Sequence, residues 1–307
     1  MARIAFLIAE TDQVQDGNYL RFANALYERH HRVTLCFMES LGMAKSRVVA
    51  SGCEVTEKIY ADELFAEMNN IYLDTFDVVW ILSLGMRHSF LDKMQLLFTL
   101  QEQCRLINSL DAIMHFKSKY FTASHSDIFK HPETWASTHP DVLYDVMQTK
   151  GGKWIVKPPA SSFGRNVYLL THNDPNAHVI LESMCGIEEN EFCMLQRYVE
   201  EIAQGEKRVI LAGGNPVGQY LRTVGRDHRT NVWQGANVAA CQLTPEERNY
   251  CERIGKRLLS FGAEYVGMDL AFPWVIEFNV INPGGITTID QLTGTDITGT
   301  ILDQIIT

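Results

Sequence analysis

Short apolar runs alternate with an amphipathic segment in the first third of the chain. Residues 3–9 (RIAFLIA) and 32–38 (RVTLCFM) read as buried strands, and residues 18–30 between them repeat apolar side chains at helical spacing. Apolar runs at 76–83 (FDVVWILS) and 104–109 (CRLINS) predict further strands. A strand, a helix and a strand in succession are typical of an open parallel α/β layer.

The pattern changes near residue 118. A short helical segment (KYFTASH) is followed by a polar, proline-bearing stretch and by a strand, KWIV, that two prolines stop. Residues 193–199 read as a strand, 207–222 as a hairpin through Gly213 and Gly214, and 244–262 as a helix capped by Thr244. We therefore expect three parts, at residues 1–118, 119–199 and 200–307.

Polar side chains stand at the ends of two apolar runs in the tract VGMDLAFPWVIEFNVINPGG, at 266–285. Alternation within VIEFN predicts that Glu277 and Asn279 share one face of a strand, with Asp269 on the preceding run. Isolated acids at strand ends are usually solvated caps, but three oxygen donors at this spacing favour Mg²⁺, which takes its other ligands from phosphates and water. The tract therefore indicates a nucleotide triphosphate site.

Composition narrows the class of protein. The chain has 307 residues, 46% of them hydrophobic and 21% charged, and no apolar run is long enough for a membrane helix. The opening MARIAFLIAETD lacks the features of a signal peptide, so we expect a cytoplasmic protein. A net charge of −10 disfavours nucleic acid. Seven scattered cysteines without a CxxC pair favour reduced thiols.

The usual phosphate-loop motifs are missing. Neither GxGxxG nor GxxxxGK[ST] occurs, and HExxH and GxSxG are also absent. Nucleotide binding would therefore depend on another arrangement of residues.

Motifs in the second part of the chain resemble those of the ATP-grasp enzymes, and are most similar to bacterial glutathione synthetases. The resemblance runs through SKYFTA, IVKP, MLQRYVEEIAQGEKRVI, GGNPVGQYLR, VGMDL, VIEFNVINP and DITGTILDQII. It implies an α/β protein with an ATP-grasp fold preceded by a Rossmann-like N-terminal α/β domain. Residues 119–199 would form the lid subdomain, and 200–307 the subdomain that carries the metal site.

The resemblance also implies an ATP site. Lysine ammonium groups suit phosphate oxygens, although a single lysine is more often a surface charge. Lys119 and Lys157 match the family's two phosphate-binding lysines, and Ser161, Ser162 and Gly164 match the loop over the phosphates. Gln196, Tyr198 and Val199 match the adenine-binding hinge, and Glu206 matches the ribose-binding acid. The loop keeps one glycine and has Ala160 and Phe163 where the family is richer in glycine, which leaves the substrate open.

Further positions match the family's reacting groups. Arginine suits transferred phosphoryl groups and carboxylates because its guanidinium can bind two oxygens, although exposed strand arginines often pair with nearby acids. The implied catalytic residues are Arg208, Arg222 and Asn279. The implied metal ligands are Asp269, Glu277 and Asn279. The implied substrate-binding residues are Arg87, Arg222, Arg229, Asn231, Asn282, Gly284 and Gly285.

The resemblance implies an ADP-forming ligase that joins a small carboxylate to an amine through an acyl phosphate, using ATP and Mg²⁺, for which Mn²⁺ could substitute. The first candidate substrates are γ-glutamylcysteine and glycine. Two alternatives stay open: an ATP-grasp ligase for another amino acid, peptide or carboxylate, and a nucleotide-binding regulatory protein without turnover. By analogy the chain would form a homodimer or homotetramer, without nucleic-acid or membrane partners.

Overall fold

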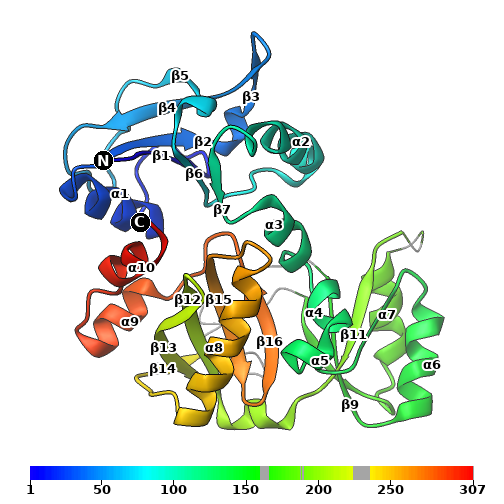
Figure 1. Ribbon diagram of the computed structural model, residues 1–307. Coiled ribbons are helices and arrows are strands. Elements are labelled where there is room, and N and C mark those ends of the chain that lie inside the picture. The colour runs from blue at the N-terminus through cyan, green and yellow to red at the C-terminus, as the bar shows by residue number, and fades with distance from the viewer. Residues whose placement is uncertain (160–165, 187, 189, 224–235, 307) are drawn as a thin grey trace.

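The computed structural model describes residues 1–159, 166–186, 188, 190–223 and 236–306. Three β-sheets follow one another along the chain (Figure 1). The structure thus has the mixed α/β character expected from the sequence.

The first sheet has the strand order β3-β4-β2-β1-β6-β7, with β5 paired to β4. The predicted strands form its parallel part, in which β1 lies between β2 and β6 and β7 follows β6. The antiparallel strands β3, β4 and β5 were not predicted, because polar residues and glycines interrupt their apolar pattern. The strands are β1 Arg3–Ile8, β2 Arg32–Phe37, β3 Gly42–Ala44, β4 Arg47–Val55, β5 Asn69–Tyr72, β6 Val78–Ile81 and β7 Arg105–Ile107.

Helices cover the first sheet and lead out of it. The helices and 3-10 turns of this region are α1 Asn18–Glu28, η1 Met38–Ser40, η2 Leu73–Thr75, η3 Arg87–Ser89, α2 Phe90–Leu100, α3 Leu110–Phe116, α4 Tyr120–Ser124 and α5 Ser126–Phe129. Phe116 and Phe129 pack against Phe278 with ring centroids 5.5 and 5.3 Å apart. The short helices after the first sheet therefore pack on the third sheet.

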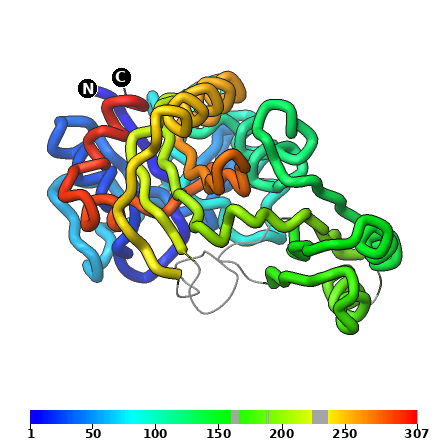
Figure 2. Tube along the Cα trace, turned by 90° about the horizontal axis from the view of Figure 1, so that it is seen from below, coloured from blue at the N-terminus to red at the C-terminus, as the bar shows by residue number. Residues whose placement is uncertain are grey.

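The second sheet is antiparallel, with the order β10-β9-β11-β8. It projects to one side of the molecule, as the green segment in Figure 2 shows. Its elements are β8 Thr134–Ser137, α6 Pro140–Lys150, β9 Lys153–Lys157, β10 Tyr168–Thr171, α7 Ala177–Cys185 and β11 Cys193–Arg197. Trp154, Leu143 and Leu181 are fully buried between this sheet and its two helices.

The third sheet has the order β14-β13-β12-β15-β16. The predicted hairpin turns at Gly213 and Gly214, both with positive φ, and the predicted helix begins at Thr244 with a complete capping box. The elements are η4 Glu200–Gln204, β12 Glu206–Ala212, β13 Asn215–Thr223, β14 Asn237–Ala239, α8 Pro245–Leu259, β15 Tyr265–Ala271 and β16 Trp274–Asn279. Helix α8 covers one face of this sheet through Cys251, Ile254 and Leu258.

A β-bulge in β16 decides which side chains reach the other face. Asp269 pairs with Glu277, whereas Leu270 pairs with Val275, so Ile276 has no opposite residue. Because of this extra residue, Val275 and Phe278 both pack in the core under α8. Glu277 is left on the open face beside Asp269, although a regular strand would place Val275 and Glu277 on the same side.

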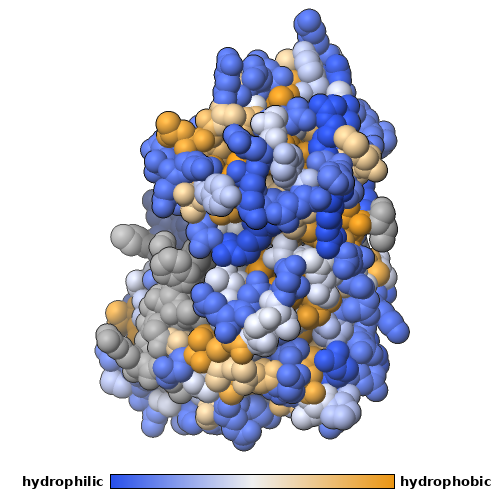
Figure 3. Space-filling view, turned by 90° about the vertical axis from the view of Figure 1, so that its left-hand side faces the viewer, coloured by the Kyte–Doolittle hydropathy of each residue, from blue (hydrophilic) through white to orange (hydrophobic). Residues whose placement is uncertain are grey.

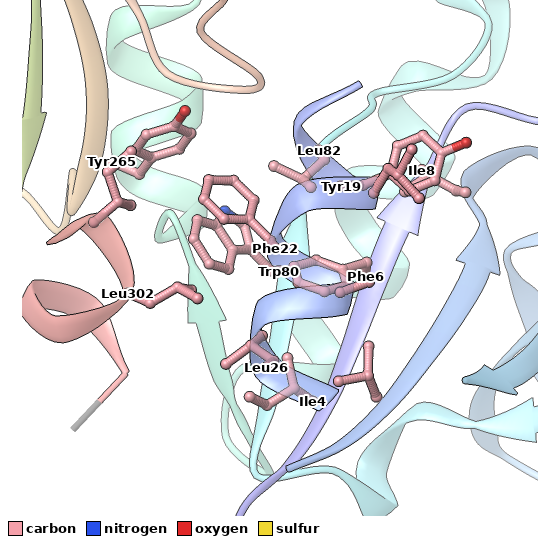
Figure 4. Close-up of a cluster of buried hydrophobic side chains, with 14 of the residues drawn as sticks. Ile4, Phe6, Ile8, Tyr19, Phe22, Leu26, Trp80, Leu82, Tyr265 and Leu302 are labelled. Atoms are coloured by element: carbon pink, nitrogen blue, oxygen red, sulfur yellow. The ribbon is translucent and has the colours of Figure 1, made fainter. Parts of the chain in front are cut away.

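The first and third sheets share one core (Figure 4). Phe22 stacks on Trp80 with centroids 4.7 Å apart, and Tyr265 from β15 meets both rings edge-on at 5.6 Å. Helices α9 (Ile286–Thr293) and α10 (Ile297–Ile305) complete this core, and Leu302 of α10 is fully buried. The last helices therefore fix the third sheet against the first.

The surface in Figure 3 is mostly hydrophilic, with scattered hydrophobic patches. In the described ranges, no helix combines the length and apolarity needed to span a bilayer. All seven cysteines lie in these ranges and are free thiols, as the sequence predicts for a reduced protein.

Candidate active site

The open face of the third sheet carries a buried cluster of opposite charges. Arg208 on β12 lies opposite Asp269 on β15, and its Nε lies 2.7 Å from Asp269 Oδ1. Arg222 on β13 lies opposite Glu206 on β12 and contacts both Glu206 and, at 2.7 Å, Asp269 Oδ1. Strand pairing thus brings together four of the residues singled out in the sequence.

Burial and charge act against each other at Arg222. Burial alone would lower the pKa of its guanidinium, but the carboxylates of Asp269 and Glu206 outweigh burial and raise that pKa. Arg222 therefore stays charged at the centre of the cluster. Each buried guanidinium is already paired with a carboxylate. A further anion can bind Arg208 or Arg222 only if one of these ion pairs breaks, because a buried charge must keep a partner.

The oxygen donors predicted for a metal lie on one face. Register places Asp269 beside Glu277, and Asn279 beside Gly267 on the same two strands. Oδ1 of Asp269 is buried and has no well-directed hydrogen bond, although two arginines attract it. Two carboxylates and one amide are the donor types that suit Mg²⁺, so these residues fit a hard cation. Within the described ranges, no group of three or more His, Cys, Asp or Glu side chains is placed to hold a metal ion, so the candidate set depends on two carboxylates and the Asn279 amide.

The two predicted phosphate lysines lie beside this face. Lys119 is 6% exposed, and its Nζ donates to Glu277 Oε1 at 3.1 Å. Lys157 ends β9, is also 6% exposed, and its Nζ donates to Gln196 Oε1 at 2.6 Å. Burial, followed by the charge of Lys119, lowers the pKa of Lys157 to about 7. Its ammonium is therefore poorly compensated until an anion approaches.

The predicted adenine hinge spans the end of β11, with Gln196 inside the strand and Tyr198 and Val199 after it. Val199 is buried, and the backbone N–H of Tyr198 donates to the carbonyl of Lys153 at 3.1 Å. Glu206, predicted to bind ribose, is buried against Arg222. The hinge and ribose roles stay predictions.

A cavity of about 550 Å³ connects the metal donors with the first sheet. Glu277, Asn279 and Asn282 line one side, and Ser83, Gly85 and Lys117 line the other. Burial, then the charge of Lys119, lowers the pKa of Lys117, with a smaller contribution from Arg87. Arg87 itself is exposed in η3, near the cavity but not in its lining.

The turn at 282–285 is held by a residue at the start of α1. Asn18 at the start of α1 donates to Asn282 Oδ1 at 2.7 Å and to the Pro283 carbonyl at 2.9 Å. Arg208 Nη1 lies 3.5 Å from the Gly284 carbonyl, and Gly285 has a φ of 135°. Three predicted substrate residues thus border the charge cluster, on a turn that α1 positions.

Five predicted site residues lie outside the described residues: Ser161, Ser162, Gly164, Arg229 and Asn231. Their assignments stay predictions.

Two functional candidates were not predicted from the sequence. Lys93 of α2 is 4% exposed, and the described contacts include no ion pair or hydrogen bond for its ammonium. A Cβ on Gly85, in the cavity wall, would lie 2.2 Å from Lys93 Nζ and 3.1 Å from Glu39 Oε1. The second is His131, also 4% exposed, which hydrogen-bonds Gln196. The sequence signal for Lys93 was its four-residue spacing from the apolar Leu97, which places both on one helix face. His131 gave no such signal.

Comparison with known proteins agrees with this geometry. Residues 118–294 match the family model "Prokaryotic glutathione synthetase, ATP-grasp domain". Glutathione synthetase of Gloeobacter violaceus is 34% identical over 176 residues, which are 57% of this chain and 54% of the relative. That of Brucella melitensis is 31% identical over 218 residues, 71% of this chain and 69% of the relative. The match thus spans between about half and two thirds of these relatives.

Solved structures share the fold over the whole chain. A RimK domain ATP-grasp protein of Sphaerobacter thermophilus superposes with a TM-score of 0.67 at 17% identity, covering 100% of both chains. D-cycloserine synthetase DcsG gives a TM-score of 0.66 at 11% identity, with 98% of this chain and 99% of that chain covered. The α/β ATP-grasp fold expected from the sequence is confirmed, whereas the Rossmann-like character of the N-terminal part stays a prediction. The chain belongs to the prokaryotic glutathione synthetase family of ATP-grasp proteins.

Proposed function

We propose that the chain is an ATP-dependent, ADP-forming ligase that joins a small carboxylate to an amine, with γ-glutamylcysteine and glycine as the first candidate pair. The observation that carries this proposal is the placement of Lys119, Lys157 and Arg208 around Asp269 and Glu277 at the end of a cavity. Such an arrangement suits a polyanion whose terminal phosphoryl group is transferred.

The chemistry follows from the charges. The substrate carboxylate attacks the γ-phosphoryl group, ADP leaves, and the amine displaces phosphate from the acyl phosphate. Lys157 and Lys119 bind phosphate oxygens, while Arg208 and Arg222 stabilise the charge that shifts during transfer. Asp269 would exchange part of its contact with the arginines for a cation.

Asp269, Glu277 and Asn279 would hold Mg²⁺, with Mn²⁺ as a substitute. A divalent cation bound there supplies charge neutralisation for the β- and γ-phosphates. The strand register supports this proposal, because the bulge at Ile276 returns Glu277 to the face of Asp269.

The carboxylate substrate would occupy the side of the cavity that Lys117 and Gly85 line. The buried ammonium of Lys93 lies against Gly85, and Glu39 Oε1 lies close to the same glycine. Compact ammonium groups are suited to a carboxylate that has left water. We therefore infer a substrate with at least one carboxylate besides the reacting one, a description that γ-glutamylcysteine meets.

The test is ADP release from the purified protein with Mg-ATP and a panel of carboxylate and amine pairs, with the amide product identified by mass spectrometry. We expect turnover with γ-glutamylcysteine and glycine. Turnover with another pair alone would keep the ligase and change the substrate, whereas ATP binding without amide formation for any pair would favour the regulatory alternative. We also propose a cytoplasmic homodimer or homotetramer, which light scattering on the purified protein would test.

A further inference from the structure

Residues 130 and 131 join the edge of the third sheet to the second sheet. The N–H of Val275 donates to the Lys130 carbonyl at 3.1 Å, and Nδ1 of His131 lies 2.8 Å from the Val275 carbonyl oxygen. Lys130 has a φ of 29°, a value that residues with side chains rarely adopt. Lys130 and His131 therefore bind both the N–H and the carbonyl of Val275, next to the bulge in β16.

The contact with Val275 determines the tautomer of His131. A carbonyl oxygen can only accept, so Nδ1 carries the hydrogen and donates it. Burial, followed by the charge of Lys157, lowers the pKa of His131 to about 4. The ring is thus neutral near pH 7, and Nε2 presents a lone pair.

That lone pair determines the orientation of Gln196. The amide nitrogen of Gln196 lies 2.8 Å from His131 Nε2 and 3.0 Å from Thr134 Oγ1, so both of its N–H groups have acceptors. The Thr134 hydroxyl uses its own hydrogen on the Pro132 carbonyl at 2.7 Å. The remaining atom, Gln196 Oε1, faces Lys157 Nζ.

The reverse orientation of the amide is excluded by the same partners. Exchanging oxygen and nitrogen would place an acceptor against His131 Nε2 and donors against the Lys157 ammonium. Each buried mismatch costs about 1–3 kcal/mol. The neutral His131 ring therefore favours the orientation in which the Gln196 oxygen, and not its nitrogen, contacts Lys157.

We propose that His131 is a positioning residue, which orients the Gln196 amide and through it holds the Lys157 ammonium for a phosphate group of ATP. The role given to Lys157 rests on the proposed ligase function, but the hydrogen-bond chain does not. His131 also contacts the carbonyl of Val275, two residues before Glu277 in β16. The same imidazole therefore supports both the proposed phosphate-binding lysine and the strand that carries a proposed metal ligand.

The first test determines the tautomer in the full-length, ligand-free protein. Long-range ¹H–¹⁵N spectra of the histidine rings distinguish Nδ1–H from Nε2–H, and the His131 signals are those missing in His131→Gln. We expect the neutral Nδ1–H ring, unchanged when the pH is lowered from about 8 to about 5.5. A ring with hydrogen on Nε2, or one that titrates near its ordinary pKa of about 6.5, would overturn the proposal.

The second test separates the two ends of the ring. His131→Gln can place a carbonyl oxygen near the position of Nε2, whereas His131→Asn can keep only a donor near Nδ1. We expect the calorimetric Kd for Mg-ATP to rise about tenfold or more in His131→Asn, a loss of about 1.4 kcal/mol. His131→Gln should recover most of that affinity.

His125→Gln is the matched control, because His125 contacts Ser124 and Phe121, outside the chain of bonds. Unfolding midpoints of all variants establish that they are folded, and the tautomer measurement on the wild-type protein decides the proposal if His131→Asn is not. Equal ATP affinity in wild type, His131→Asn and His131→Gln would contradict the proposal. If wild type binds ATP but forms no amide with any pair, the ligase proposal fails while the tautomer and affinity results still decide the role of His131.

Discussion

Lys157 is a buried ammonium next to a second lysine. Its pKa of about 7 means that the charged form dominates only below that pH in the free protein. ATP binding favours the charged form, so we expect the Kd for Mg-ATP to rise as the pH increases through about 7. Calorimetry across this range measures the effect.

Lys157→Arg provides the control, because a guanidinium stays charged throughout. The variant should bind ATP with a flatter dependence on pH. An unchanged dependence in Lys157→Arg would assign the titration to another group, such as the half-buried Lys117.

Glu277 is a metal candidate whose side chain is 31% exposed and contacts Lys119. Glu277→Gln keeps its size and removes its charge, so we expect a nearly unchanged unfolding free energy and a loss of Mg-dependent turnover of about 100-fold or more, the range for removing an electrostatic group at a reacting centre. Urea unfolding and initial rates at several Mg²⁺ concentrations measure both. Wild-type rates would contradict the metal assignment.

Lys93 tests the carboxylate end of the cavity. Lys93→Met removes the ammonium but keeps an unbranched side chain. We expect the KM for the carboxylate substrate to rise about tenfold or more, as for a lost charged hydrogen bond of roughly 1.5–3 kcal/mol. The Kd for ATP should stay constant. A change in ATP affinity with a normal carboxylate KM would show that Lys93 acts elsewhere.

At the scale of elements, β15 passes close to the charge cluster. A Cβ on Gly267 would lie 2.6 Å from Arg208 Nη1 and 2.7 Å from Pro283 Cβ. Gly267→Ala should therefore lower the unfolding free energy by about 1–3 kcal/mol, as for overpacking. Denaturant unfolding measures it, and Gly42→Ala in β3 is the control, since its nearest atom would be 3.9 Å away. Equal stability of the two variants would mean that Arg208 moves without cost.

Sequence patterns predicted many elements and a set of oxygen donors, but not how β16 brings them together. Alternation indicated that Glu277 and Asn279 share a face, and the register confirms it. The bulge at Ile276 was not visible, because an extra residue changes pairing without changing composition. His131 was equally hidden, since its role depends on Val275 and Gln196, which are 144 and 65 residues away.

At the scale of the whole molecule, α10 connects two sheets. Leu302 is fully buried in the core that contains Phe22, Trp80 and Tyr265. Leu302→Ala should cost about 2–5 kcal/mol, the usual range for a buried leucine. Both sheets should lose stability together. In one urea titration, the unfolding transition measured by tyrosine and tryptophan fluorescence should coincide with the transition measured by circular dichroism.

Val179→Ala in α7 is the control, because Val179 is 62% exposed and should change little. Separate transitions for the two probes in Leu302→Ala would contradict a shared core.

The shared core also has a consequence for the order in which the chain matures. Synthesis runs from β1 toward α10, and the core that contains Phe22 and Trp80 also contains Tyr265 and side chains of α9 and α10. A nascent chain that ends before these elements leaves Phe22 and Trp80 without their partners. Non-local contacts of this kind slow folding and expose apolar surface to aggregation. The first sheet to be synthesised is therefore among the last to have its core completed.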